Sequence, residues 1–252
     1  MQNSEPGTFT TFELQSSLFM LSDDQLLLIR SYDLWRHFSD EEYEALNVVH
    51  NFIEAKKGEY IYFEAFHHNK LYFLKEGHVR IGYIDEQGNE VIREIIEKGE
   101  IFGQLTLERN NLQGEFAQAY KGDVSLCAFT IESFGQLLAK KPELALKYTK
   151  QVGSKLRTIE NRLVNLLNKD VKTRLVSFLW QLALQHQHEQ TADVIHIPNY
   201  LTHEDIAQLI GASRQTITTL INELSADGVV VYNRQEILFP DVKKLQKLAN
   251  VG

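Results

Sequence analysis

The stretch Leu201–Leu224, LTHEDIAQLIGASRQTITTLINEL, decides the fold of the C-terminal part of this chain. Apolar residues recur at helical spacing on both sides of Gly211, which predicts two short helices joined by a tight turn. Thr202 begins the first helix with a capping-box pattern, and Ser213 is placed to cap the second. The pattern predicts a helix-turn-helix, whose second helix enters the major groove of DNA. An ordinary helical hairpin is the alternative that these residues leave open.

The second helix has an apolar and a polar face. The apolar face consists of Ile217, Leu220, Ile221 and Leu224. The polar face consists of Arg214, Gln215, Thr218, Thr219 and Asn222. Two apolar runs, Val229–Tyr232 and Ile237–Phe239, follow with a polar turn between them, which predicts a small hairpin. A recognition helix followed at once by a hairpin is typical of a winged helix.

The segment Ile206–Ile217, IAQLIGASRQTI, together with this hairpin resembles the Crp/Fnr family of bacterial transcription regulators. The resemblance extends to Leu71–Arg80 and Gly99–Gly103, which look like the double-stranded β-helix of cyclic-nucleotide-binding domains. It implies an α+β chain with an N-terminal jelly roll, a long dimerisation helix and a C-terminal winged helix-turn-helix. The partners it implies are a palindromic double-stranded DNA site, a second copy of the chain, RNA polymerase and a small-molecule effector of unknown identity.

The chain divides into four predicted parts. These are an N-terminal arm with a short helix (1–30), a sensor domain (31–142), a dimerisation helix (143–169) and the winged helix-turn-helix (170–252). Two capped helices are expected at 22–30 and 39–46. Short alternating segments from Asn51 to Phe129, with turns between them, predict an antiparallel barrel or jelly roll. One of these predicted chain reversals falls at Lys75–Gly77.

A heptad seam marks the dimerisation helix. Its residues recur at alternating spacings of four and three, and they are Val152, Leu156, Ile159, Leu163 and Leu166. Such a stripe is typical of a two-helix seam, although it could also pack on the roll of its own chain. Because the family dimerises through this helix, we favour a parallel homodimer.

The sensor pocket departs from what the resemblance implies for cyclic AMP. The Gly-Glu-Leu motif reads Gly103-Gln104-Leu105, and the Arg-Ser-Ala segment falls at Gly114-Glu115-Phe116, where the cation is missing. The hydroxyl pair on the long helix falls at Ile159-Glu160. A carboxylate near a buried phosphate repels it. We therefore expect that cyclic AMP contacts are lost, and that these residues line a pocket for another ligand or that side chains such as Phe116 fill it.

The resemblance also assigns DNA contacts. Arg214, Gln215 and Thr219 fall at the positions that contact bases, and Arg and Gln can form paired hydrogen bonds to guanine and adenine edges, respectively. Hydroxyl groups suited to phosphates are those of Thr202, Ser213, Thr216 and Thr218. For Ser213 and Thr216, local helix capping is the alternative role.

Composition bounds the remaining possibilities. The net charge of the 252 residues is −8, and acidic residues slightly outnumber basic ones in the C-terminal part as well. Besides a DNA-binding regulator with a silent pocket and one gated by another ligand, this acidic balance suits a third hypothesis. In that hypothesis the protein is a dimeric effector-binding adaptor that does not bind DNA. The apolar runs fall short of the roughly 20 residues needed to span a membrane, and the N-terminus lacks a secretory pattern, so we expect a cytoplasmic protein.

Reactive groups give little sign of chemistry. The single cysteine, Cys127, falls in an apolar strand and is expected to be a buried structural thiol. His67-His68 and the pair His186 and His188 with Glu189 are weak candidates for a metal. The sequence shows no nucleophile–base set and no phosphate loop, so we expect neither an enzyme nor a bound cofactor.

Overall fold

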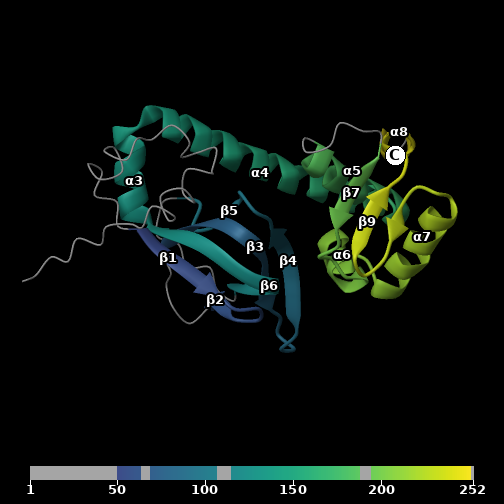
Figure 1. The fold of residues 1–252 in the computed structure, drawn as a ribbon, viewed down its shortest axis with the longest axis horizontal. Coiled ribbons are helices and arrows are strands. Elements are labelled where there is room, and N and C mark those ends of the chain that lie inside the picture. Colours follow the sequence, from purple (N-terminus) through teal and green to yellow (C-terminus); the bar gives the residue numbers. More distant parts are fainter. Residues whose placement is uncertain (1–49, 64–68, 107–114, 188–193, 251–252) are drawn as a thin grey trace, which may run out of the picture.

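The computed structural model describes residues 50–63, 69–106, 115–187 and 194–250. Figure 1 shows a β-sheet body and a smaller, mainly helical C-terminal body, with helix α4 running from one to the other. The predicted fold class, α+β with an N-terminal roll and a C-terminal winged helix-turn-helix, is confirmed. The predicted arm and the helices at 22–30 and 39–46 lie outside the described residues.

Six strands of the described residues form the sheet of the N-terminal body. They are β1 (His50–Ala55), β2 (Tyr60–Tyr62), β3 (Lys70–Ile84), β4 (Glu90–Ile96), β5 (Ile101–Gly103) and β6 (Glu115–Thr130). All pairings are antiparallel, in the order β1-β6-β3-β4, with β2 also on β6 and β5 also on β3. The two long strands β3 and β6 therefore form the centre on which the short strands pair.

The reversal predicted at Lys75–Gly77 is wrong, because β3 continues through it. Gly77 has a φ of 84°, and a Cβ atom there would lie 2.5 Å from the carbonyl oxygen of Asp123 on β6. The pairing of β3 with β6 shifts register on both sides of Glu76. Glycine at this position thus marks an irregular, close approach of two strands, which a side chain would prevent.

Two helices close one end of the roll. Helix α3 (Ile131–Lys140) is capped by the hydroxyl of Thr130, and α4 (Pro142–Asn168) starts at a proline, which suits the first helical position. Leu144 and Tyr148 of α4 are buried in a cluster with Phe134 of α3 and residues of β3 and β6. Only the first turns of α4 thus belong to this core.

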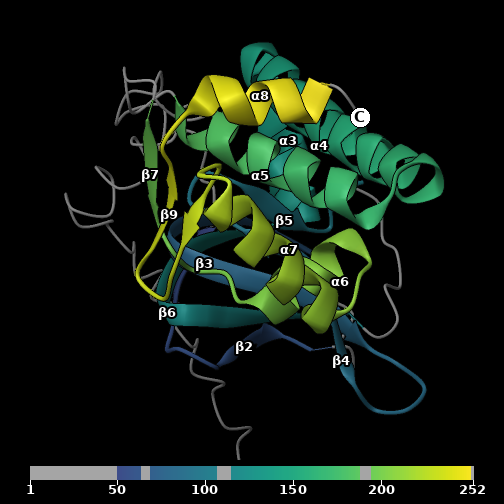
Figure 2. The same cartoon turned by 90° about the vertical axis from the view of Figure 1, so that its right-hand side faces the viewer.

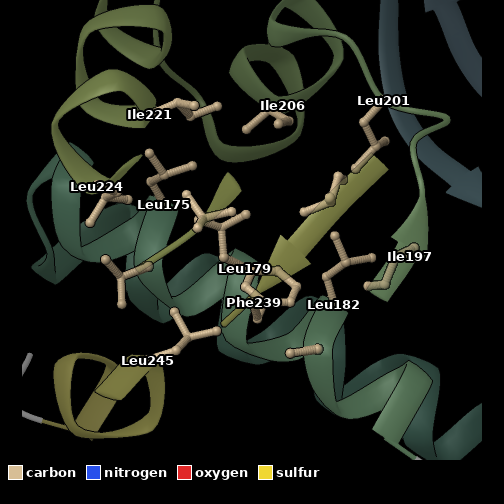
Figure 3. Close-up of a cluster of buried hydrophobic side chains, with 14 of the residues drawn as sticks. Leu175, Leu179, Leu182, Ile197, Leu201, Ile206, Ile221, Leu224, Phe239 and Leu245 are labelled. Carbon is tan, nitrogen blue, oxygen red and sulfur yellow. The ribbon is translucent and has the colours of Figure 1, made fainter. Parts of the chain in front are cut away.

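The C-terminal body has its own core. Its elements are α5 (Val171–Gln187), β7 (Ile195–Pro198), α6 (His203–Ile210), α7 (Arg214–Ala226), β8 (Val231–Tyr232), β9 (Glu236–Phe239) and α8 (Val242–Asn250). Figure 2 shows α8 lying along α5, and Figure 3 shows Leu175 and Leu179 of α5 gathered with Ile221 and Phe239. The predicted hairpin is confirmed as β8 and β9, and β7 adds a third strand, in the order β7-β9-β8. None of the described helices has the length and apolar composition needed to cross a bilayer.

Candidate DNA-binding surface and sensor pocket

The helix-turn-helix is built by local hydrogen bonds that the sequence predicts. The hydroxyl of Thr202 accepts from the amide of Asp205, whose carboxylate accepts from the amide of Thr202, so the capping box is present. Gly211 ends α6 in the left-handed conformation, with a φ of 69°. The hydroxyl of Ser213 then accepts from the amide of Thr216 and caps α7. These caps fix where both helices begin and end.

The polar face of α7 is uncovered in this structure. Arg214, Gln215, Thr216 and Thr219 are exposed, whereas Ile217 on the opposite face is fully buried. Thr219 donates its hydroxyl proton to the carbonyl of Gln215 one turn earlier, and Thr216 pairs with Ser213. Arg214 and Gln215 therefore supply the longest exposed side chains, which suit contacts to base edges.

Thr218 differs from the other predicted contact residues because it is only partly exposed. Its hydroxyl bonds to the carbonyl of Arg214 and to Nδ1 of His203, 2.9 Å away. The His203 ring also contacts the ring of Tyr232, with centroids 5.0 Å apart. The Thr218 side chain thus bonds to α6, next to the hairpin of β8 and β9. Its role at a phosphate stays a prediction.

Sequence reasoning did not single out His203, which connects α6, α7 and β8. Burial and the nearby charge of Arg214 lower the pKa of its imidazole. The hydroxyl of Tyr232 donates to the carbonyl of Leu201, just before α6, and so attaches strand β8 to the start of the helix-turn-helix. The only sign in the sequence was the position of His203 directly after the cap Thr202.

The predicted sensor-pocket residues fall into two groups in the structure. Gly103 ends β5 and Gln104 follows it, and a Cβ atom on Gly103 would lie 2.6 Å from the carbonyl oxygen of Lys70. Gln104 is buried, and its side-chain amide donates to the hydroxyl of Thr106 over 2.7 Å. The carbonyl of Leu105 accepts from the hydroxyl of Tyr148 on α4. This group thus joins the edge of the sheet to the first turns of α4.

The second group lies at the start of β6. Phe116 is fully buried and contacts the ring of Tyr60 edge-on, so it fills space inside the roll. Glu115 is also buried, and its carboxylate receives a hydrogen bond of 2.6 Å from the hydroxyl of Tyr62. The second oxygen pairs with Arg93 of β4 at 2.6 Å. Sequence reasoning missed Arg93, because β4 lies more than twenty positions earlier in the chain and carries no motif.

The remaining pocket candidates, Ile159 and Glu160, lie exposed on α4. The predicted seam divides as well. Leu156, Ile159 and Leu163 are more than half exposed, together with Val164 and Leu167, which were not predicted. Val152 packs partly on the roll, and a Cδ atom of Leu166 lies close to Gly211 in the turn of the helix-turn-helix. The exposed apolar row is therefore Leu156, Ile159, Leu163 and Leu167.

Comparison with protein families matches both bodies. Residues 52–141 match the model of the cyclic nucleotide-binding domain, and residues 173–248 match the Crp-like helix-turn-helix domain. A global nitrogen regulator of Nostoc sp. is 30% identical over 169 residues, which are 67% of this chain and 75% of that protein. The chain belongs to the Crp/Fnr family.

Other members of this family agree over most of their length. A CRP-like cAMP-activated global transcriptional regulator of Mycobacterium tuberculosis is 25% identical over 197 residues, 78% of this chain and 87% of that protein. A solved structure of a CooA mutant from Carboxydothermus hydrogenoformans aligns with a TM-score of 0.67 and 25% identity, covering 84% of this chain and 92% of that one. A CRP/FNR-family regulator from Thermus thermophilus aligns with a TM-score of 0.60 and 25% identity, covering 79% and 98%. This protein is therefore a DNA-binding transcription regulator of the Crp/Fnr type.

In this Crp/Fnr protein, polar contacts attach the helix-turn-helix to the roll. The backbone amide of Ile92 on β4 donates to the side-chain oxygen of Gln208 on α6 over 2.7 Å. The hydroxyl of Tyr120 on β6 donates to the capping carboxylate of Asp205 over 2.7 Å. Both contacts use the side of α6 that faces β4, so they leave the polar face of α7 exposed.

A second junction lies beside the first. The hydroxyl of Tyr200, just before α6, bonds to the carboxylate of Glu97, which also pairs with His186 of α5 at 3.2 Å. The ring of His78 on β3 stacks on Tyr200 with centroids 4.1 Å apart, and burial lowers the pKa of that histidine. Strand β3, the β4–β5 turn and α5 therefore meet at the entry to α6.

The expectation for Cys127 is confirmed, because the thiol is buried and burial raises its pKa. The described residues contain no cluster of three or more metal-ligating side chains. His67-His68, His188 and Glu189 lie outside the described residues, and His186 pairs with Glu97 instead.

Proposed function

We propose that this regulator acts as a homodimer on a palindromic DNA site, and that its sensor pocket does not take cyclic AMP. One observation carries the dimeric, DNA-bound state: a single chain leaves the polar face of α7 and the apolar row of α4 uncovered at the same time. Arg214, Gln215 and Thr219 read bases, and Thr202, Ser213, Thr216 and Thr218 contact phosphates or set the helix that does. RNA polymerase is the further partner, the location is the cytoplasm, and no catalytic step is assigned.

The homodimer is supported by the exposure of Leu156, Ile159 and Leu163 along one side of α4. Large apolar side chains in a continuous row are a favourable surface for a second copy, because burying each releases about 1.5–3 kcal/mol. Val152 and Leu166 contribute at the ends of the seam, where they also touch the roll and the helix-turn-helix. We also propose that the chain divides at 142 and 169, a division supported by the extent of α4, Pro142–Asn168.

The loss of cyclic AMP binding is supported by the Glu115 carboxylate, which is buried where the resemblance expects a phosphate-binding cation. Its negative charge opposes a phosphate in the same space. Gln104 is also committed to a bond with Thr106. A regulator gated by a different small molecule is the second candidate, because the polar groups of Gly103–Leu105 connect directly to α4 through Tyr148.

The test is selection of bound fragments from random genomic duplexes at moderate salt, with and without cyclic AMP. We expect the same palindrome to be enriched in both. Enrichment only with the nucleotide would contradict the proposed loss of cyclic AMP contacts, and no enrichment would favour a missing effector or the adaptor. For variants of the contact residues on α7, Lys57→Ala is the matched control, since Lys57 is an exposed cation in the turn between β1 and β2.

A further inference from the structure

The ion pair between Glu115 and Arg93 connects the interior of the roll to its surface. The Glu115 side chain is 6% exposed, whereas that of Arg93 is 51% exposed. One oxygen of the buried carboxylate accepts a hydrogen bond from the Tyr62 hydroxyl, and the other forms the ion pair with the Arg93 guanidinium. A buried carboxylate that lost one of these groups would be strongly destabilised, so the pair fixes where the Arg93 side chain lies.

The backbone at Arg93 holds the other two parts of the molecule. Its carbonyl oxygen accepts a hydrogen bond of 2.7 Å from the Arg162 guanidinium on α4. The same guanidinium donates to the carbonyl of Gln208 on α6, and the neighbouring amide of Ile92 donates to the side chain of Gln208. One short segment of β4 therefore contacts Glu115 through the Arg93 side chain, and α4 and α6 through its backbone.

The charges around this segment favour an anion at Arg93. Burial, together with the charge of Arg93, lowers the pKa of Arg162, while Glu94 acts in the opposite direction. Glu94 is itself paired with Lys155 at 2.7 Å, so Glu115 is the carboxylate that pairs with Arg93. Two guanidinium groups thus share this corner of the roll, and an anion bound to Arg93 reduces their repulsion.

We infer that the carboxylate of Glu115 is a built-in anionic ligand of the sensor pocket, and that the pocket positions α6 for DNA binding with no added effector. The ligand chemistry that the pocket recognises is therefore a carboxylate, supplied by the chain itself. This inference rests on the proposed function. It predicts that the Glu115–Arg93 pair favours DNA binding, because the arrangement with α6 against β4 leaves Arg214 and Gln215 exposed and hence available to DNA.

Chemical rescue tests the inference. Glu115→Ala removes the carboxylate and leaves a small space beside Arg93, so we expect DNA affinity to fall roughly tenfold, a typical size for coupling between two sites. Acetate should restore most of that loss in this variant and leave the wild type unchanged. Acetamide, which has the same shape without the charge, should restore nothing at matched ionic strength, with chloride replacing acetate in the control.

The double variant Arg93→Met/Glu115→Ala is the matched control, and acetate should not rescue it. Equal effects of acetate and acetamide, or wild-type affinity in Glu115→Ala, would overturn the inference. Tighter DNA binding by Glu115→Ala would also overturn it, since the pair would then hold the protein in an inactive arrangement. If Glu115→Ala does not fold, Glu115→Gln keeps the size and removes the charge, and wild-type affinity in that variant counts against the inference.

A measurement without DNA separates the two proposals. In Glu115→Ala, amide hydrogen exchange of β4 and α6 should be faster than in the wild type, and acetate should slow it again. If acetate slows exchange but the wild type selects no DNA, the built-in anion stands and the proposed function fails. If the wild type selects DNA while acetate does not change hydrogen exchange in Glu115→Ala, the proposed function stands and the built-in anion fails.

Discussion

Helices α4 and α7 each leave one face uncovered, but the chemistry of the two faces is opposite. On α4 the uncovered residues are apolar, with Leu156, Ile159 and Leu163 at 56%, 58% and 56% exposure. On α7 they are polar, with Arg214 and Gln215 at the N-terminal end. Exposure alone therefore does not say what binds a surface. An apolar row gains by excluding water, whereas polar side chains gain by meeting hydrogen-bonding groups such as base edges.

The largest effect is expected from breaking the apolar face. Ile159→Glu/Leu163→Glu places two carboxylates in the row, where a two-helix interface would have to bury them at high cost. The variant should sediment as a monomer and lose about a hundredfold or more in affinity for the palindrome, because each half-site would be bound independently. Leu146→Glu is the control, since Leu146 is 65% exposed but lies outside the row. A stable Ile159→Glu/Leu163→Glu dimer would show that another surface joins the copies.

The next effect concerns Arg174, which connects the end of α4 to the turn between α6 and α7. The Arg174 guanidinium on α5 donates to the carbonyls of Ile210 and Gly211 in the turn, and to that of Lys169 after α4. Arg174→Met removes three charge-assisted hydrogen bonds, so the free energy of unfolding of the C-terminal body should fall by about 2–3 kcal/mol. Denaturant unfolding followed by the fluorescence of Trp180, which packs against this core, measures the change.

Lys172→Met supplies the comparison for Arg174→Met. Lys172 is an exposed cation on the same helix whose pair with Glu223 lies at 3.4 Å, a distance and exposure that contribute little. We expect a change below about 0.5 kcal/mol for this control. Similar losses of unfolding free energy in the two variants would mean that positive charge on α5, and not the Arg174 hydrogen bonds to the turn, stabilises this region.

Breaking the polar face should have a smaller effect than breaking the apolar one. Arg214→Ala should lower specific affinity by about 1–3 kcal/mol and relax one base position, because one paired contact to a base edge is lost while the dimer persists. Binding-site selection with the variant and with Lys57→Ala measures both quantities. An unchanged sequence preference would refute the assignment of Arg214 as a base contact.

The sequence predicted the two helix faces with different success. The features that set where α6 and α7 begin and end are local: the caps at Thr202 and Ser213, the left-handed Gly211 and the helical spacing. Along α4 the heptad pattern gave the helix and its apolar side, but Val152 and Leu166 also contact other elements, which periodicity does not report.

The roll was harder to predict, because its important contacts join strands far apart in the chain. A single glycine, Gly77, looked like a turn although it marks a close strand approach. The altered pocket motifs singled out Glu115 as the residue at the place of the missing cation, but they did not predict its burial. Its partner Arg93 comes from another strand and has no sequence signal. Likewise, nothing in the sequence pairs Tyr120 with Asp205 or Tyr200 with Glu97.

The smallest effect concerns the covered side of α4, where Lys155 bonds to Glu94 and to the carbonyl of Ile101. Burial raises the pKa of the neighbouring Glu100 from 4.5 to about 7. The folded protein therefore keeps Glu100 protonated between these values while the unfolded chain ionises it, so the free energy of unfolding falls as pH rises from about 4.5 to about 7 and then levels off.

Glu100→Gln removes this penalty and keeps an oxygen to accept the amide of Glu97. At pH 8 the variant should be more stable than the wild type by about 1 kcal/mol, less than the full pKa difference implies because water reaches part of the side chain. Below pH 4.5 the two should converge. Glu86→Gln, in the exposed turn between β3 and β4, should show no such window. A parallel pH dependence of Glu100→Gln and wild type would mean that α4 leaves this carboxyl in water, and that its covered side is as open as the row opposite.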